Sequence, residues 1–487
     1  MSDRAPITRR LAAFIAGTTP ETLPEEVVAY SKQLIFDGIG TLVSATHPSV
    51  TASAGIGAFA MAQGGAGRAT LIGREAKVDV VNAALANGTL GYASDFEPHH
   101  PEAILHPIAV MLPTALALCE AEGRNGRDLV TAVALGCEIT YRVSMALDPR
   151  ELYALGFHPS AIAGSFGAAA AAAYLLRLSA EQTVRTLGLA ALQTSGMMAW
   201  QDDPREDARP FQMGLGARNG VTAALLAQGG FGAPDRIFDG GHTVLKAYSR
   251  VADPAPLTDG LGAVWDGVME LAIKPYPCVS FLHPALDALE ALLSRHALAS
   301  SDIRAIRLRF ADAGAHCVDG NPLKGHNAQY VLPVRAALGR LSYLDLFHDR
   351  RLSDPEVARL AESATVERDF GEFEARFPDF YIGEVTLTLA DDQELRERCD
   401  IARGYPESPL SGAEIETKFR SIVGEVADQS RTDRLAEAAA SIHEAASVEA
   451  LAALLGQAPH RGLGAETQNR EANRNSTREK SNEVSLH

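Results

Sequence analysis

The densest run of ionisable side chains lies between Asp95 and Pro107, where the sequence reads DFEPHHPEAILHP. It holds three carboxylates and three imidazoles, groups that can bind a charged small molecule and move protons at neutral pH. Its three prolines prevent a regular helix before His106. We therefore predict a loop that ends at a helix N-terminus, a common place for active-site residues. The alternative is a solvated surface loop whose histidines only cap the next helix.

Histidine precedes proline at three places, each directly before an apolar helical run: His106, His158 and His283. Because proline suits the first helical position, each imidazole is expected beside free backbone N–H groups and the positive end of a helix dipole. That environment suits a substrate carboxylate. For any single pair, simple capping remains the alternative.

Two cations stand in restrained settings. Lys274, in IKPYPC, lies between an apolar residue and two prolines, at the point where the helical pattern of the sequence ends. It could neutralise a carboxylate or, if desolvated, act as a base. Arg209, in RPFQ, could hold a carboxylate with two parallel hydrogen bonds, although a surface role is a stronger alternative for Arg209 than for Lys274.

Asp95, His99, His100 and His106 also offer oxygen and nitrogen ligands for a metal. Their spacing matches neither HExxH nor a paired Cys/His arrangement, so we predict no metal site. The glycines of GLGARNG follow no predicted strand and fail the GxGxxG order, which argues against a dinucleotide site. The sequence contains no P-loop or GxSxG elbow.

The elements that must position these residues are mainly helices. Aromatic residues make up only 6% of the 487 residues, while alanine and glycine are abundant, which favours closely packed helices over a sandwich or barrel. The run AIAGSFGAAAAAAYLLRL is predicted to be a buried helix. Two segments, 303–310 and 381–389, alternate apolar with polar residues and are predicted to be strands.

We accordingly predict a mainly α fold with a large all-helical domain and a smaller α+β lid domain. The helical domain is expected to be discontinuous, formed by 1–268 and 406–455, because a helical sequence pattern resumes after the two predicted strands. The lid is assigned to 269–405. Residues 456–487 contain few large apolar residues and are predicted to be disordered.

Composition restricts the partners. The formal net charge is −17 and no basic tract is interleaved with aromatic residues, so neither nucleic acid nor an anionic membrane surface is an expected partner. Five dispersed cysteines without a CxxC pair fit a reducing compartment. The N-terminus lacks a secretory signal and no apolar run of membrane-spanning length is evident, so a cytoplasmic location is predicted.

Several motifs in fixed order resemble the MmgE/PrpD superfamily, and the resemblance spans about residues 5–455. They are ASDFE followed by His106-Pro, GFHPSAIAGSFG, RPFQMGLGARNG, IKPYPC and QYVLPV. The superfamily includes 2-methylcitrate dehydratase, cis-aconitate decarboxylase and iminodisuccinate epimerase. The resemblance implies a helical domain with a smaller α+β lid, a homodimer, an active site in the cleft between the domains, and no cofactor.

Carried over by position, the family's acidic residue falls on Asp95 and its second histidine on His158. Its first histidine falls near His100 or on His106, its lysine on Lys274 and its tyrosine on Tyr330. Two departures concern the substrate pocket. Glu97-Pro98 stands where several members have an acidic residue and threonine, and Arg209-Pro-Phe-Gln212 stands where many have Lys-Pro-Leu-His.

We therefore predict a cofactor-independent lyase that acts next to a carboxylate of a small di- or tricarboxylate, as 2-methylcitrate dehydratase does. A cis-aconitate type decarboxylase and an epimerase or isomerase remain alternatives, and a metal-dependent hydratase or a non-catalytic scaffold is less favoured. The predicted catalytic residues are Asp95, His106, His158 as the principal acid/base, and Lys274. The predicted substrate-binding residues are His100, Arg209, Gln212 and Tyr330.

Overall fold

The larger part of the molecule is a bundle of helices around α8 (Pro159–Leu175), every residue of which is buried. A computed structural model describes residues 5–203, 205, 207–347, 353–378 and 380–460. α8 packs against α5 (Pro107–Glu122), α6 (Gly126–Leu147) and α10 (Ala208–Gln228). The predicted buried helix is thus confirmed. The other elements of this part are α1 (Ile7–Gly17), α2 (Glu25–Ser44), α3 (Thr51–Gln63), β1 (Ala69–Leu71), β2 (Ala76–Val78), α4 (Val80–Leu90), α7 (Pro149–Ala154), α9 (Ala180–Ala191), α11 (Val244–Tyr248) and α12 (Asp266–Met269).

Glycine permits the close contact between α8 and α10. A Cβ atom built on Gly220 would lie 2.4 Å from the Cβ of Ala168 and 2.5 Å from its carbonyl carbon. No side chain fits there unless the backbone moves. The abundance of small residues therefore has a direct packing consequence. Because the helices approach so closely, the N-termini of α5, α8 and α10 can lie near one another.

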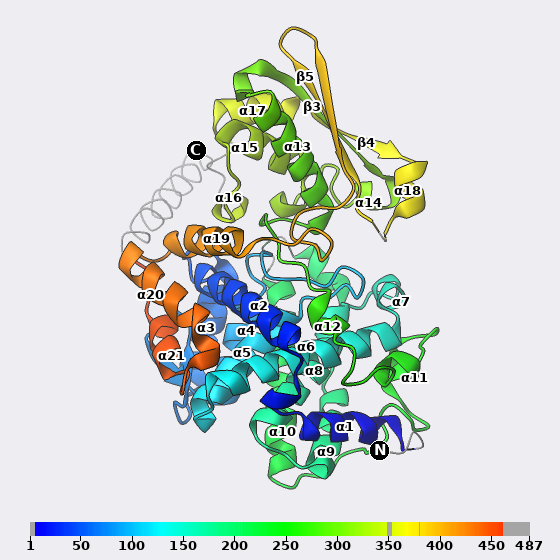
Figure 1. Ribbon diagram of the computed structural model, residues 1–487, viewed down its shortest axis with the longest axis vertical. Coiled ribbons are helices and arrows are strands. Elements are labelled where there is room, and N and C mark those ends of the chain that lie inside the picture. Colours follow the sequence, from blue (N-terminus) through cyan, green and yellow to red (C-terminus); the bar gives the residue numbers. More distant parts are fainter. Residues whose placement is uncertain (1–4, 204, 206, 348–352, 379, 461–487) are drawn as a thin grey trace, which may run out of the picture.

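The smaller part contains a four-stranded sheet in the order β4-β3-β5-β6. β3 (Ile303–Ala311) runs parallel to β4 (Ala364–Asp369) and antiparallel to β5 (Gly383–Leu389), which pairs antiparallel with β6 (Glu394–Cys399). In Figure 1 the helices α13, α15 and α17 lie together on one side of this sheet. The helices of this part are α13 (His283–Arg295), α14 (Asp312–Ala315), α15 (Ala328–Leu338), α16 (Leu344–Phe347), α17 (Pro355–Glu362) and α18 (Glu372–Arg376).

The two predicted strands are confirmed as β3 and β5. The apolar side chains Ile306, Leu308 and Phe310 of β3 face the core while the residues between them are partly exposed, and the centre of β5 is buried. β4 and β6 were not predicted. Their sequences, ATVERD and ELRERC, contain few apolar residues, because edge strands leave much of their surface in water. The alternation that reveals a half-buried strand is therefore weak in them.

The chain returns to the helical part at its C-terminal end, where α19 (Gly412–Gly424) packs against α2. Figure 1 shows α19, α20 (Gln429–Ala440) and α21 (Glu449–Gly456) beside the N-terminal helices. The apolar core of the helical part contains residues from Leu11 to Ile273 and from Leu410 to Leu455, with Tyr343 added from the smaller part. A second, separate core contains residues from Tyr276 to Leu387. These cores motivate the division at 268 and 405, which stays a proposal.

The start of the predicted tail belongs to the ordered structure. The Arg431 side chain donates to the carbonyl oxygens of Leu454, Gln457 and Ala458. Residues 461–487, the rest of the predicted tail, lie outside the described residues.

Within the described ranges, one helix is long and apolar enough to cross a membrane by length and composition alone. This helix is α6, and 89% of its most apolar window is buried inside the protein. Burial among other helices explains its composition without a membrane.

We expect Gly220→Ala to lower the free energy of unfolding by at least about 1–3 kcal/mol, because the new methyl group meets backbone atoms of α8 that cannot rotate away. Gly424→Ala is the matched control, since nothing lies within 4 Å of a Cβ at that position in α19. It should be neutral or stabilising by up to about 1 kcal/mol. Urea denaturation of both variants measures the difference, and equal effects would contradict the packing argument.

Candidate active site

The carboxylate of Asp95 is buried in contact with two cations. Lys274 Nζ lies 2.7 Å from Asp95 Oδ1 and donates to the Asp95 carbonyl oxygen at 3.0 Å. Arg209 Nη1 lies 3.5 Å from the same Oδ1. Burial alone would raise the pKa of Asp95, but Lys274 and Arg209, assisted by His326 and His106, hold the pKa well below its usual value. Asp95 is therefore ionised at neutral pH.

Backbone pairing explains why Lys274 reaches Asp95. His99 and Ala272 form an antiparallel bridge in which each amide donates to the other's carbonyl, at 2.9 and 2.7 Å. The Ile273 amide also donates to the carbonyl of Gly404. The segment after α12 is thus held beside the loop from Asp95 to Pro107, and its next residue is Lys274.

The ring of Tyr92 contacts the imidazoles of His106 and His158 and the guanidinium of Arg209. The Tyr92 ring is 4.5 Å from that of His106 and 5.9 Å from that of His158, measured between ring centroids, and the Arg209 guanidinium lies 4.5 Å from its centroid. His106 Nδ1 lies 2.6 Å from Glu97 Oε1. A carboxylate at this distance fixes the orientation of the ring.

The N-termini of α5 and α8 meet at these histidines. His106 precedes α5 and His158 precedes α8, each followed by proline at the first helical position. The His106 amide donates to Ser160 Oγ at 3.0 Å, which joins the two helix ends. The His-Pro pairs therefore place two imidazoles side by side, as well as beginning two helices.

His158 is a neutral imidazole at neutral pH. Burial, followed by the nearby charges of His106 and Arg209, lowers its pKa to about 3. Its Nδ1 and the second carboxylate oxygen of Glu97, Oε2, are buried without a hydrogen-bond partner among the described residues. Buried polar atoms are almost always paired, so these two are exceptions beside the buried charge of Asp95.

Asp95 and Arg209 line a cavity of about 260 Å³ that is rich in cations. Arg205, Lys324 and His326 also line it, and the last two belong to the smaller part of the molecule. The cavity therefore lies between the two parts. Its charge suits a polyanion of small size.

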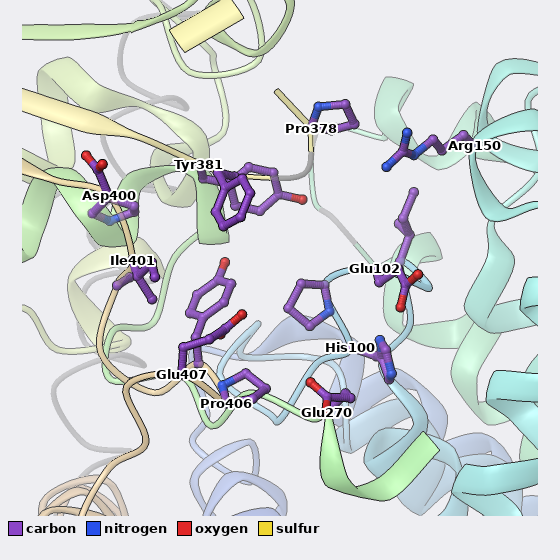
Figure 2. Close-up of a pocket in the computed structure, with 16 residues that line it drawn as sticks. His100, Glu102, Arg150, Glu270, Pro378, Tyr381, Asp400, Ile401, Pro406 and Glu407 are labelled. Carbon is purple, nitrogen blue, oxygen red and sulfur yellow. The ribbon is translucent and has the colours of Figure 1, made fainter. Parts of the chain in front are cut away.

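A second cavity, of about 320 Å³, has the opposite character. Figure 2 shows that Glu102, Glu270, Asp400 and Glu407 are among its lining residues, with Arg150 as the cation. An anionic molecule is repelled by such a lining, whereas the cavity at Asp95 attracts it. The cation-rich cavity is therefore the better candidate for a carboxylate substrate.

The structure brings five of the predicted site residues together and separates two others. Asp95, His106, His158, Arg209 and Lys274 form one cluster through the contacts above. Gln212 lies next to this cluster, since its hydrogen bond raises the pKa of His158. Its side-chain amide also donates to the carbonyl of Met197.

His100 and Tyr330 lie elsewhere. The Nε2 of His100 is 3.3 Å from the carbonyl oxygen of Asp266, and its ring stacks on Tyr141 and lines the acidic cavity. Tyr330 is buried in the smaller part, where its hydroxyl donates to the carbonyl of Asp345 and its ring lies under Lys324 Nζ at 5.4 Å. Tyr330 thus supports a residue of the cavity.

Sequence reasoning missed four residues of this site. Tyr92 had a usable signal, because it stands directly before the ASDFE motif and three residues before Asp95. Trp200, whose ring lies 6.0 Å from that of His158, is part of a short 3-10 turn, Met198–Asp202, that has no recognisable sequence pattern. Lys324 and His326 come from a short loop of the smaller part and carry no local signal.

Ligand atoms of Asp95, Glu97 and His106 lie within 4.8 Å of one another, close enough to hold a metal ion. The charges of Lys274 and Arg209 already compensate Asp95, and they would repel a divalent cation at this place. The arrangement therefore favours an organic anion over a metal, and the absence of a metal stays a prediction.

Comparison with known proteins matches both parts of the chain. The MmgE/PrpD N-terminal domain matches residues 9–257, and the MmgE/PrpD C-terminal domain matches residues 276–444. The cis-aconitate decarboxylase-like protein oryM of Aspergillus oryzae is 27% identical over 92% of this chain and 97% of its own. The cis-aconitate decarboxylase of Aspergillus terreus is 26% identical over 92% and 96%, and that of Homo sapiens 27% over 85% and 87%.

We expect acid to destabilise the fold in part through His100. Burial lowers the pKa of His100 to about 4, below the ordinary 6.5, so the unfolded chain binds its proton first as the pH falls. The stability that the neutral ring contributes is complete above pH 6.5 and is lost as the pH approaches 4.

Between pH 7 and pH 5 this loss amounts to about 2 kcal/mol. His100→Gln should remove that share of the pH dependence of the free energy of unfolding, measured by urea denaturation at both pH values. His296→Gln, at an exposed position, is the control. An unchanged pH dependence in His100→Gln would contradict the assignment.

Proposed function

Because this chain belongs to the MmgE/PrpD family and is a lyase of that type, we propose that it decarboxylates cis-aconitate or a closely related unsaturated tricarboxylate. The main observation behind the proposal is the cavity that Arg209, Arg205, Lys324 and His326 line together with the buried carboxylate of Asp95. The relatives named above support the same reaction, since cis-aconitate decarboxylases align with nearly the whole chain.

The reaction needs neutralised charge and one proton. When CO₂ leaves the carbon next to a C=C bond, the electron pair of the broken C–C bond forms a new C=C bond. The electrons of the original double bond then shift toward the carboxylate at its far end. A proton delivered to the carbon beside that carboxylate completes the product. Cations around the site lower the energy of the delocalised anion, and a site of low polarity strengthens their effect.

We assign charge neutralisation to Arg209 and to Lys324 of the smaller part, and the His326 imidazole lines the same cavity. Arg209 can grip a carboxylate with two parallel hydrogen bonds, whereas its high pKa makes it a poor proton donor. Lys274 has a different task. Its ammonium group binds the carboxylate and the carbonyl of Asp95, so the pair holds the loop from Asp95 to Pro107 in place and determines the electrostatic potential beside it.

Proton delivery falls to His106 in this proposal. Its contact with Glu97 through Nδ1 orients the ring and leaves Nε2 to transfer a proton. His158, whose pKa burial lowers to about 3, is a poor donor at neutral pH and suits a role as hydrogen-bonding partner or base. This assignment differs from the sequence-based expectation, which gave the principal acid/base role to His158.

Purified protein incubated with cis-aconitate in deuterated water should release CO₂ and form itaconate with one deuterium on the carbon beside a carboxylate. The activity should survive treatment with EDTA. Water loss from 2-methylcitrate without CO₂ release would instead identify a dehydratase, and label exchange without either would identify an epimerase. Loss of activity with EDTA would contradict the metal-free assignment. The homodimer and the cytoplasmic location stay predictions from the sequence.

His106→Asn should lower kcat by about 10²–10⁴, the usual cost of losing a general acid, and should do so more than His158→Asn. Arg209→Lys should mainly raise KM and leave kcat within about tenfold, because it weakens a two-point grip without removing proton transfer. Steady-state kinetics with circular dichroism as a folding control measures both effects. If His158→Asn lost more kcat than His106→Asn, the proton donor would be His158.

A further inference from the structure

A second buried lysine reaches the same loop from the C-terminal end of the chain. Lys418, on α19, lies 2.7 Å from Asp37 Oδ1 on α2 and donates to the carbonyl oxygen of Phe96 at 2.8 Å. Its ammonium group also lies 4.1 Å from the centroid of the Phe96 ring. Asp37 is fully buried and Lys418 is 8% exposed. Figure 1 shows α19 lying across α2, which brings the two charges together.

The carbonyl groups of two consecutive residues are thus held by two lysines. Lys274 binds the carbonyl of Asp95, and Lys418 binds the carbonyl of Phe96. The backbone of Asp95 has a φ of +50°, in the left-handed region that residues other than glycine rarely adopt. Such a conformation costs about 1–3 kcal/mol and persists only when surrounding contacts hold it.

Phe96 stands between the two acidic residues of the site. A rotation of its peptide groups would change the direction of both the Asp95 and the Glu97 side chains. Burial raises the pKa of Asp37 and lowers the pKa of Lys418, and in each case the charge of the partner opposes the shift. The charge of Lys274 also lowers the pKa of Lys418, so the two lysines are within electrostatic reach of each other. Lys418 is therefore placed to control the geometry of the loop without lining the cavity at Asp95.

We propose that Lys418, with Asp37 as its counter-ion, is a positioning residue that holds Phe96 and thereby sets Asp95 and Glu97 for catalysis. This inference rests on the proposed function only for the reaction that is measured. The opposing interpretation is a buried ion pair with a purely structural role. Such pairs can often be replaced by apolar residues without loss of stability, but an apolar residue cannot donate to the Phe96 carbonyl.

A cavity beside Lys418 permits a direct test. Phe96 and Lys418 line a cavity of about 340 Å³ together with Tyr276, Ser342 and other residues. The substitution Lys418→Ala would remove most of the side chain and extend this cavity toward the Phe96 carbonyl. A small amine such as ethylamine could then enter and restore the missing hydrogen bond.

We expect Asp37→Leu/Lys418→Met, which removes both charges, to fold and to lower kcat for cis-aconitate at least tenfold with a smaller change in KM. Ethylamine should raise the kcat of Lys418→Ala several-fold and leave the double variant unchanged. The matched control is Arg431→Met, on the neighbouring α20, where a buried cation also binds backbone carbonyls. Its kcat should remain within about twofold.

Hydrogen exchange gives a readout that does not depend on the substrate. Exchange of the amides between Tyr92 and His106 should accelerate in Lys418→Ala and in the double variant, whereas Arg431→Met should affect only the contacts near Gln457. Inactivity of the wild-type protein on cis-aconitate would overturn the proposed function and leave this test intact. A folded double variant with wild-type kcat and unchanged exchange in this loop would overturn the inference.

Discussion

The burial of the Asp95 charge is the constraint on which the rest of the site depends. A carboxylate removed from water is strongly destabilised unless opposite charges and hydrogen bonds compensate it. Lys274 and Arg209 provide this compensation from segments far apart in the chain. The contact of Lys274 also holds the strained backbone of Asp95. The site is therefore complete only when α10 and the segment after α12 have both packed against the loop.

Small residues make this assembly possible. The contact of α8 with α10 leaves no room for a side chain at Gly220, and the contact of α8 with α6 leaves none at Gly167. With the helices this close, the N-termini of α5 and α8 meet, and the imidazoles of His106 and His158 share the ring of Tyr92 as a neighbour. Packing thus determines the distance between the two imidazoles, and burial then determines that His158 stays neutral.

The distribution of charge separates two cavities that composition alone would not distinguish. The chain as a whole has a net charge of −17, yet the cavity at Asp95 is lined by cations from both parts of the molecule. The other cavity is lined by the carboxylates of Glu102, Glu270, Asp400 and Glu407, together with His100. Local potential, which directs a charged substrate, depends on this arrangement more than on the total charge.

The sequence by itself determined the fold class, the two central strands, the helix starts at Pro107 and Pro159, and the candidates Asp95, His158, Arg209 and Lys274, because local periodicity, proline geometry and motif order are all readable along the chain. It did not determine which neighbouring histidine faces the site. Successive residues of an extended segment point to opposite sides, and the pairing of His99 with Ala272 sends His100 away from Asp95. Lys324 and His326 likewise join Asp95 only through the packing of the smaller part on the helices. Tertiary contacts alone decided these positions, since the free energy that sets them comes from burial and charge pairing between distant segments, which leave no pattern in the local sequence.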